Sequence, residues 1–148
     1  MQTRKYAEIG EQVFHKKMSA DFSTNFPCAL LVAEDKLINQ LVIVNILDRL
    51  GYKPDLVKNG EEAVEAVTEK DYDIVLMDMK MPVMDGLVAT RLIRKKQLKQ
   101  PVIIALTANT LKGDEQDCLD AGMDDYIGKP IRLEDLMDKL EKWCKRPK

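Results

Sequence analysis

The chain has 148 residues, of which 45% are hydrophobic and 32% charged, a composition typical of one globular domain rather than of a disordered or membrane-embedded chain. Its formal net charge of −2 gives no support for nucleic-acid binding, which selects basic surfaces. No apolar stretch approaches the roughly 20 residues needed to cross a bilayer, and the N-terminus lacks a signal-peptide pattern. The three cysteines suggest neither a disulfide framework nor a zinc site, so we expect a cytoplasmic protein without membrane contact by this segment.

Residues 1–27 stand apart from the rest of the chain. They are polar, have only weak periodicity and end at Pro27, and we interpret them as an N-terminal extension or linker. From residue 28 to residue 146 the pattern is regular, which predicts one domain. This part contains short apolar runs with the length of buried strands, at residues 29–33, 54–57, 73–77, 102–106 and 126–127.

Segments with helical spacing follow the strands. They cover residues 36–50, a helix capped by Asn59, residues 86–96, residues 112–121 and a last helix that begins near Leu133. In the first of these helices, four apolar residues form one stripe that we expect to face the sheet: Leu37, Leu41, Val44 and Leu47. Gly51 and Gly122 follow two of the helices as natural stops.

Strands that are apolar throughout and alternate with helices indicate a parallel sheet that is covered on both faces. Right-handed crossovers then favour a doubly wound, three-layer α/β sandwich. We therefore predict a flavodoxin-like (βα)5 fold with a parallel sheet in the strand order 2-1-3-4-5.

The segment DIVLMDMKMPVMDG, residues 73–86, ends a buried strand at a carboxylate, Asp78. Ligands of open parallel sheets bind beyond the carboxyl ends of the strands. The other polar residues predicted at that edge are Glu34 and Asp35 after the first strand, Thr107 after the fourth and Lys129 after the fifth. Each of them alone is explained by a helix cap, a turn or a surface charge. Their occurrence together at one edge is a specific sign of a functional site.

Three converging carboxylates repel one another unless a cation lies among them, and oxygen ligands suit Mg²⁺ or Mn²⁺. Thr107 and Lys129 would supply the hydrogen-bond donor and the positive charge that a phosphoryl group needs. Asp78 is then the candidate nucleophile, since carboxylates form aspartyl-phosphates. The edge therefore predicts a site for in-line phosphoryl transfer, which depends mainly on positioning and charge neutralisation.

Four segments carry a resemblance to a known family: LLVAEDKLINQ at residues 30–40, DIVLMDMKMPVMDGLVATRLIR at 73–94, PVIIALTAN at 101–109 and GMDDYIGKPI at 122–131. Residues 28–145 resemble the receiver domain of two-component response regulators, and most of all the C-terminal receiver of hybrid sensor histidine kinases. One position departs from the pattern, because hybrid-type receivers usually have asparagine where this chain has Lys36. We expect this difference to tune metal binding modestly and not to abolish it.

The resemblance implies a role for each residue at the predicted edge. Asp78 would accept the phosphoryl group. The ligands of Mg²⁺ would be Glu34, Asp35, Asp78 and the backbone carbonyl of Lys80. The residues that bind the phosphoryl group and switch would be Thr107, Ala108, Tyr126 and Lys129. The peptide bond before Pro130 would be cis. Lys80 and Asn109 would tune the lifetime of the phosphoryl group.

We therefore predict a phosphoacceptor receiver domain in a two-component phosphorelay. It would take a phosphoryl group from a histidine of a kinase or of a histidine phosphotransfer domain, and then change conformation. It would not be a turnover enzyme by itself, and it would be either a stand-alone receiver or the C-terminal receiver of a larger hybrid histidine kinase. Two alternatives stay open: a docking module that is not phosphorylated, and a haloacid-dehalogenase-type aspartyl-phosphate hydrolase. The second is disfavoured because that class resembles Asp-x-Asp at its nucleophile, whereas Met79 and Lys80 follow Asp78.

The first predicted helix is more apolar than covering one face of the sheet requires. Four further residues add to its stripe: Ile38, Val42, Ile43 and Ile46. The surplus predicts an exposed apolar patch, a common mark of docking sites, which here would meet a helical bundle that carries the donor histidine. The resemblance also allows a homodimer through the face of the fourth helix, fifth strand and fifth helix, and a tether to a membrane sensor kinase in a longer protein.

Overall fold

The structure is a computed structural model that describes residues 21–108 and 112–144. Within these ranges the sheet has five strands, all parallel, in the order β2-β1-β3-β4-β5. The strands are β1 (Leu30–Ala33), β2 (Asp55–Val57), β3 (Ile74–Asp78), β4 (Val102–Thr107) and β5 (Asp125–Gly128). This result confirms the predicted flavodoxin-like α/β fold.

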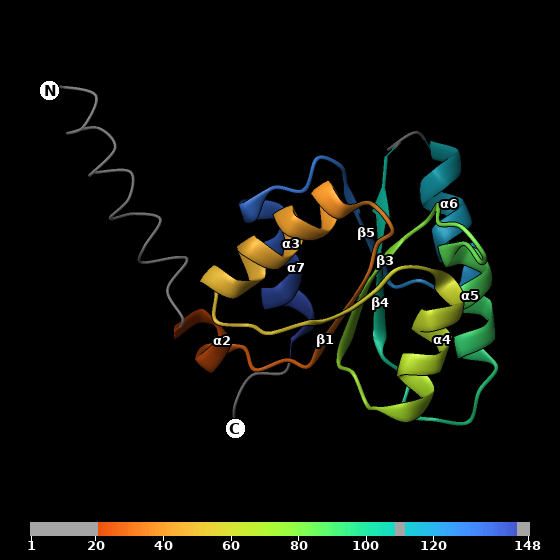
Figure 1. Ribbon diagram of the computed structural model, residues 1–148, viewed down its shortest axis with the longest axis horizontal. Coiled ribbons are helices and arrows are strands. Elements are labelled where there is room, and N and C mark those ends of the chain that lie inside the picture. The colour runs from red at the N-terminus through yellow and green to blue at the C-terminus, as the bar shows by residue number, and fades with distance from the viewer. Residues whose placement is uncertain (1–20, 109–111, 145–148) are drawn as a thin grey trace, which may run out of the picture.

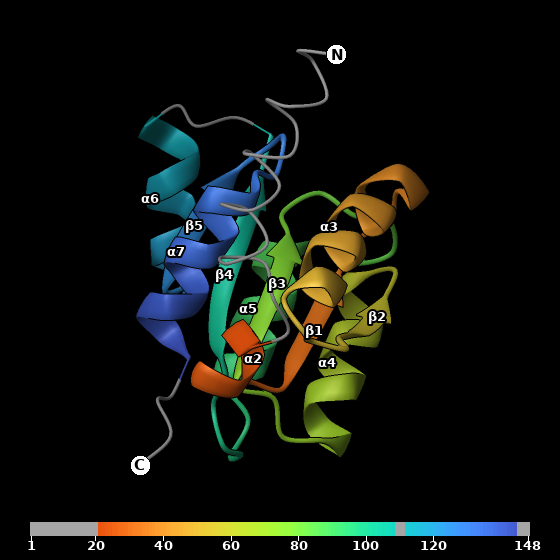
Figure 2. The same ribbon diagram turned by 90° about the vertical axis from the view of Figure 1, so that its left-hand side faces the viewer.

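The helices cover both faces of the sheet (Figures 1 and 2). On one face lie α3 (Leu37–Arg49), α7 (Leu133–Trp143) and the short helix α2 (Asp21–Asn25). On the other face lie α4 (Gly60–Glu69), α5 (Gly86–Arg94) and α6 (Lys112–Ala121). In the described part of the chain, no helix is long and apolar enough to span a membrane.

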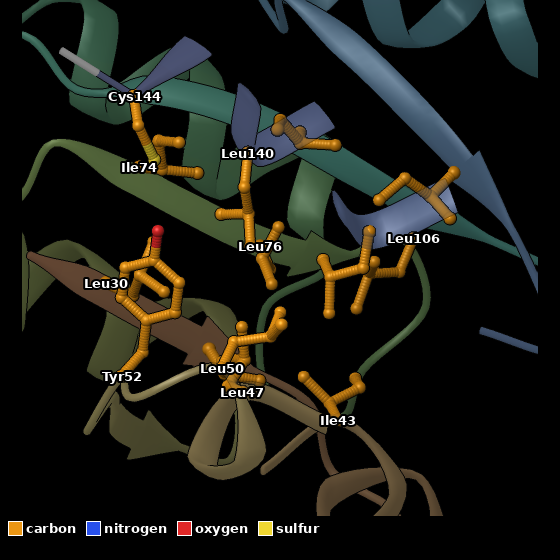
Figure 3. Packing of buried hydrophobic residues seen from close by; sticks show 14 residues of the cluster. Leu30, Ile43, Leu47, Leu50, Tyr52, Ile74, Leu76, Leu106, Leu140 and Cys144 are labelled. Atoms are coloured by element: carbon orange, nitrogen blue, oxygen red, sulfur yellow. The ribbon is translucent and has the colours of Figure 1, made fainter. Parts of the chain in front are cut away.

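Each face of the sheet has its own hydrophobic core, because successive strand residues point to opposite faces. In β1, Leu30 and Val32 pack towards α3 and α7, whereas Leu31 and Ala33 pack towards α4 and α5. Figure 3 shows the first of these cores, with side chains from α3, β3, β4 and α7: Ile43, Leu47, Ile74, Leu76, Leu106 and Leu140. The strands that carry the loops are therefore packed on both faces of the sheet.

The predicted inward stripe of α3 was right for Leu47 and wrong for Leu37 and Leu41. Leu37 and Leu41 are 66% and 59% exposed, and the buried residues of this helix are Gln40, Ile43 and Leu47. Periodicity could not select the inward face, because α3 has apolar residues on almost every side. The position of the helix on the sheet selects it. Of the four further apolar residues, Ile38 and Val42 are exposed as expected, whereas Ile43 is buried and Ile46 packs partly buried against the core.

Local signals at the helix ends were predicted correctly. The side chain of Asn59 caps α4, since its Oδ1 accepts a hydrogen bond from the backbone N–H of Glu62 at 2.8 Å. Gly51 and Gly122 follow α3 and α6 with φ angles of 95° and 106°, a left-handed conformation that glycine adopts without a steric penalty.

Candidate functional site

Three carboxylates lie together where β1 and β3 end. Ala33 pairs with Met77, so Glu34 and Asp78 follow them at the same edge of the sheet. One carboxylate oxygen from each of Glu34, Asp35 and Asp78 lies within 4.8 Å of the other two. This edge, at the carboxyl ends of the strands, is the upper one in Figure 2.

Lys129 brings a positive charge to the same place from the end of β5. Its Nζ lies 3.2 Å from Glu34 Oε1 and 3.1 Å from Asp78 Oδ2. Its backbone N–H donates to the carbonyl oxygen of Thr107 at 2.8 Å, which holds the chain after β5 against the end of β4. The Lys129–Pro130 peptide bond is cis. One ammonium therefore contacts two of the three carboxylates.

Glu34 is fully buried. Burial and the neighbouring Asp78 carboxylate raise the pKa of Glu34 to about 7, although Asn39 and Lys129 act in the opposite direction. The Glu34 carboxyl thus carries a proton in part of the molecules at neutral pH. A ligand that needs the ionised form competes with that proton.

The oxygen atoms of the cluster fit a hard divalent cation. Glu34 Oε2 and Asp35 Oδ1 are buried and have no hydrogen-bond partner among the described residues. Buried polar atoms are rarely left without a partner, and carboxylate oxygens are the ligands that Mg²⁺ prefers. The donor set and the excess of carboxylates over the single Lys129 ammonium therefore both suit such an ion.

Further predicted residues belong to the chain after β3 and to the end of β4, which pairs with β3 at Asp78 and Leu106. Thr107 ends β4 and is buried, and Ala108 is exposed directly after it. The backbone N–H of Lys80 donates to Asp78 Oδ1 at 3.4 Å, while the Lys80 side chain is exposed. The predicted position Asn109 lies outside the described residues.

Tyr126 lies on β5, two strands away from Asp78. Its ring is half-buried and packs at the margin of the core beneath α4, α5 and α6. Lys139 Nζ on α7 lies 5.8 Å from the ring centroid. The carboxylate of Glu115 on α6 raises the pKa of the Tyr126 phenol. Charged side chains from both helices that flank β5 therefore lie beside this ring.

Two residues near the site were missed by the sequence reasoning. Gln40 is buried in α3, and its Nε2 donates to the backbone carbonyl of Glu34 at 2.6 Å. Asn39 contacts the Glu34 side chain and lowers the pKa of that carboxyl. The available signal was two adjacent amides inside an apolar helix, with Asn39 four residues after Asp35. They position Glu34 through its backbone and its side chain.

Fold and site together define a receiver-type α/β domain. The family model described as "Response regulator receiver domain" matches residues 30–141. The chain belongs to this family.

Two proteins with similar sequences have the names of histidine kinases. The chain is 35% identical to the "Probable histidine kinase 1" of Oryza sativa subsp. indica over 90% of its own length, and 42% identical to the "Histidine protein kinase 1" of Candida albicans over 83%. It spans only 17% of the first of these relatives and 5% of the second.

Two solved structures place the similarity at the receiver. The receiver domain of the sensor histidine kinase PA1611 from Pseudomonas aeruginosa has a TM-score of 0.74 and 44% identity, covers 78% of this chain and 96% of its own, and has a magnesium ion in its active-site cleft. The receiver domain of Saccharomyces cerevisiae Ssk1 was crystallised with the histidine phosphotransfer protein Ypd1. That match has a TM-score of 0.73 and 33% identity, over 80% of this chain and 90% of the matched chain.

Proposed function

We propose that this domain accepts a phosphoryl group on Asp78 from a phosphorylated histidine of a partner protein, with Mg²⁺ as its cofactor. The observation that carries the proposal is the environment of Asp78. Its nearly buried carboxylate lies beside Lys129 Nζ at 3.1 Å and within reach of two further acids. The domain would act within a longer hybrid histidine kinase, since its relatives are histidine kinases of which it spans a small part.

In this reaction an Asp78 carboxylate oxygen forms a bond to phosphorus, and the bond between phosphorus and the donor histidine nitrogen breaks. The Lys129 ammonium neutralises charge on the phosphoryl oxygens. The Thr107 hydroxyl and the backbone of Ala108 would bind the transferred group. Mg²⁺, held by Glu34, Asp35, Asp78 and the backbone carbonyl of Lys80, would supply further charge neutralisation when bound.

The proposed output is a local switch. Thr107 would move to the phosphoryl group and Tyr126 would turn inward, which changes the face formed by α6, β5 and α7. This face is also the one that we propose for a homodimer. Lys80 and Asn109 would tune the lifetime of the phosphoryl group, because they lie two residues after Asp78 and Thr107, respectively.

Intact mass after incubation with Mg²⁺ and acetyl phosphate tests the proposal. We expect the wild type to gain one phosphoryl group and Asp78→Asn to gain none, and a chelator should prevent the gain. Circular dichroism of both proteins serves as the control for folding. A folded wild type that gains no phosphoryl group from acetyl phosphate or from a phosphorylated donor domain would favour the docking module instead.

The affinity for Mg²⁺ should depend on pH through Glu34. The ionised form of Glu34 is the one that binds a metal ion, and its pKa is raised to about 7 by burial and by Asp78. We therefore expect the apparent Kd to be about tenfold weaker at pH 6 than at pH 8, measured by isothermal titration calorimetry.

Glu34→Gln should bind Mg²⁺ more weakly and with little dependence on pH over the same range. Asp55→Asn is the matched control, because Asp55 pairs with Lys70 in an exposed ion pair on β2, away from the acidic cluster. Equal affinities of the wild type at pH 6 and pH 8 would show that Glu34 does not control binding.

The exposed part of α3 is the proposed contact for the donor protein. Its apolar patch consists of Leu37, Ile38, Leu41 and Val42, with exposed fractions between 41% and 75%. The patch begins next to Asp35, so a helical bundle seated on it could present a histidine to Asp78. The class of partner is supported by the Ssk1 receiver, which was crystallised with a histidine phosphotransfer protein.

The double variant Ile38→Glu and Val42→Glu should slow transfer from a phosphorylated histidine phosphotransfer domain by about tenfold or more, because charge replaces an apolar contact. The rate with acetyl phosphate should stay unchanged. Leu119→Glu, on the exposed face of α6, is the control, since Leu119 is also exposed but lies on the opposite side of the sheet. Equal slowing with both donors would contradict a docking role.

A further inference from the structure

The last residues before β1 form hydrogen bonds to the body of the domain. The backbone N–H of Ser23 in α2 donates to the carbonyl oxygen of Leu50 at 3.0 Å, directly after the last turn of α3. The hydroxyl of Tyr52 donates to the carbonyl oxygen of Phe26. These bonds join segments that are distant in the sequence, since Phe26 and Tyr52 are 26 residues apart.

Aromatic packing accompanies the hydrogen bonds. The ring centroids of Phe22 and Phe26 lie 4.9 Å apart, and the Phe22 ring meets the Tyr52 ring edge to face at 6.3 Å with an interplanar angle of 73°. Both phenylalanines pack against the core shown in Figure 3, which includes Tyr52 and Cys144 at this end. A segment that acted only as a free tether would not pack two partly buried aromatic rings against the core.

This contact lies at the edge of the sheet opposite the acidic cluster. In Figure 2, α2 lies beside the start of β1 at the lower edge of the sheet, whereas Glu34 follows the end of that strand. The chain therefore enters the folded domain at the amino ends of the strands, and Asp78 lies at their carboxyl ends.

We propose that residues 21–27 are an anchor that belongs to the folded domain, so that the domain includes these residues and does not begin at residue 28 as the sequence pattern suggests. The anchor docks on the end of α3 and on Tyr52. It fixes the point of chain entry away from the acidic cluster and from the apolar patch of α3, and it leaves both accessible to a partner protein.

Amide hydrogen exchange of the full chain tests the anchor directly. The Ser23 amide should exchange at least about tenfold more slowly than in an unfolded peptide, because its hydrogen bond to Leu50 opens only when α2 undocks. The double variant Phe22→Ala and Phe26→Ala should lose this protection, while amides of β3 and β4 stay protected. Exchange of the wild-type Ser23 amide at the unfolded rate would overturn the proposal.

Thermal unfolding gives a second readout. The double variant should unfold at a temperature roughly 5 °C or more below the wild type, because two packed rings are lost. Thr24→Ala is the matched control, since Thr24 belongs to the same short helix but is exposed, and it should unfold close to the wild type. Equal unfolding temperatures of the double variant and Thr24→Ala would also overturn the anchor. Phosphorylation by acetyl phosphate should be unchanged in every variant, because Asp78 lies at the far edge.

Discussion

Lys129→Met is expected to slow phosphorylation of Asp78 by acetyl phosphate about 10²-fold, the loss that follows when one group stabilising a transition-state charge is removed. The Lys129 ammonium lies 3.1 Å from Asp78 Oδ2, and methionine keeps most of the side-chain volume without the charge. The time course of intact mass at saturating Mg²⁺ measures the rate.

The same substitution should destabilise the metal-free fold by on the order of 2–3 kcal/mol at pH 8, because Glu34 and Asp78 are left adjacent and buried without the Lys129 charge. This loss of stability, the deficit of the variant relative to the wild type, should depend on pH. Burial and Asp78 raise the pKa of Glu34 from 4.5 to about 7, and Lys129 opposes this rise, so the variant should have a still higher pKa.

The sign of the pH dependence follows from that shift. A carboxyl with a folded-state pKa above its unfolded value contributes full stability below the unfolded pKa and loses it as the pH rises through the folded pKa. The deficit of Lys129→Met should therefore be smallest near pH 4.5 and largest above pH 7, and Mg²⁺ should reduce it. Urea unfolding with a chelator, at several pH values, measures it.

Lys70→Met is the matched control for both measurements. Lys70 forms an ion pair with Asp55 at 3.0 Å, but both side chains are about half exposed, so its loss should cost no more than about 1 kcal/mol and leave phosphorylation unchanged. If Lys129→Met matched Lys70→Met in rate and in stability, the proposed role of the Lys129 charge would be wrong.

The fold and the acidic cluster could be predicted from the sequence because both depend on local patterns. Apolar runs such as 74–77 identify the strands, and parallel strands bring their carboxyl ends to one edge, so Glu34 and Asp78 had to converge. The inward face of α3 could not be predicted in this way. Hydrophobicity does not select the inward face of a helix that is apolar on most sides. The buried amide of Gln40 donates to the backbone carbonyl of Glu34, a contact that the sequence pattern does not reveal.

Polar contacts between residues far apart in the sequence could not be predicted from the sequence pattern either. Arg94 was predictable as a basic residue that suits the end of α5. In the structure its Nε donates to the carbonyl oxygen of Gly122, and its guanidinium forms an ion pair with Asp124 at 2.8 Å. These partners lie about 30 residues further along the chain, and they meet Arg94 only when α5 and β5 have both packed on the sheet.

Gly86 is the position where adding one methyl group should have the largest effect on stability. A Cβ at Gly86 would lie 2.2 Å from the carbonyl oxygen of Asp78 and 2.9 Å from Met77 Cγ. The backbone oxygen cannot move aside without a shift of β3. The N–H of Gly86 also donates to the carbonyl oxygen of Met79 at 2.9 Å, which fixes the start of α5 against the end of β3.

Gly86→Ala should therefore lower the free energy of unfolding by about 3 kcal/mol or more, at the upper end of the cost of overpacking. Gly113→Ala is the matched control, because Gly113 lies in α6 and a Cβ there meets nothing within 4 Å. Alanine is the better helix former, so this control should raise the free energy of unfolding by about 0.5–1 kcal/mol.

Urea unfolding of the two alanine variants compares the same chemical change at a crowded and at an open position. Opposite signs are expected, and similar values for both would show that β3 and α5 are not held at this contact. The effect should reach the functional site as well. Because the obstructing atom is the carbonyl oxygen of Asp78, any folded Gly86→Ala protein must shift Asp78, so it should take up a phosphoryl group from acetyl phosphate more slowly than Gly113→Ala.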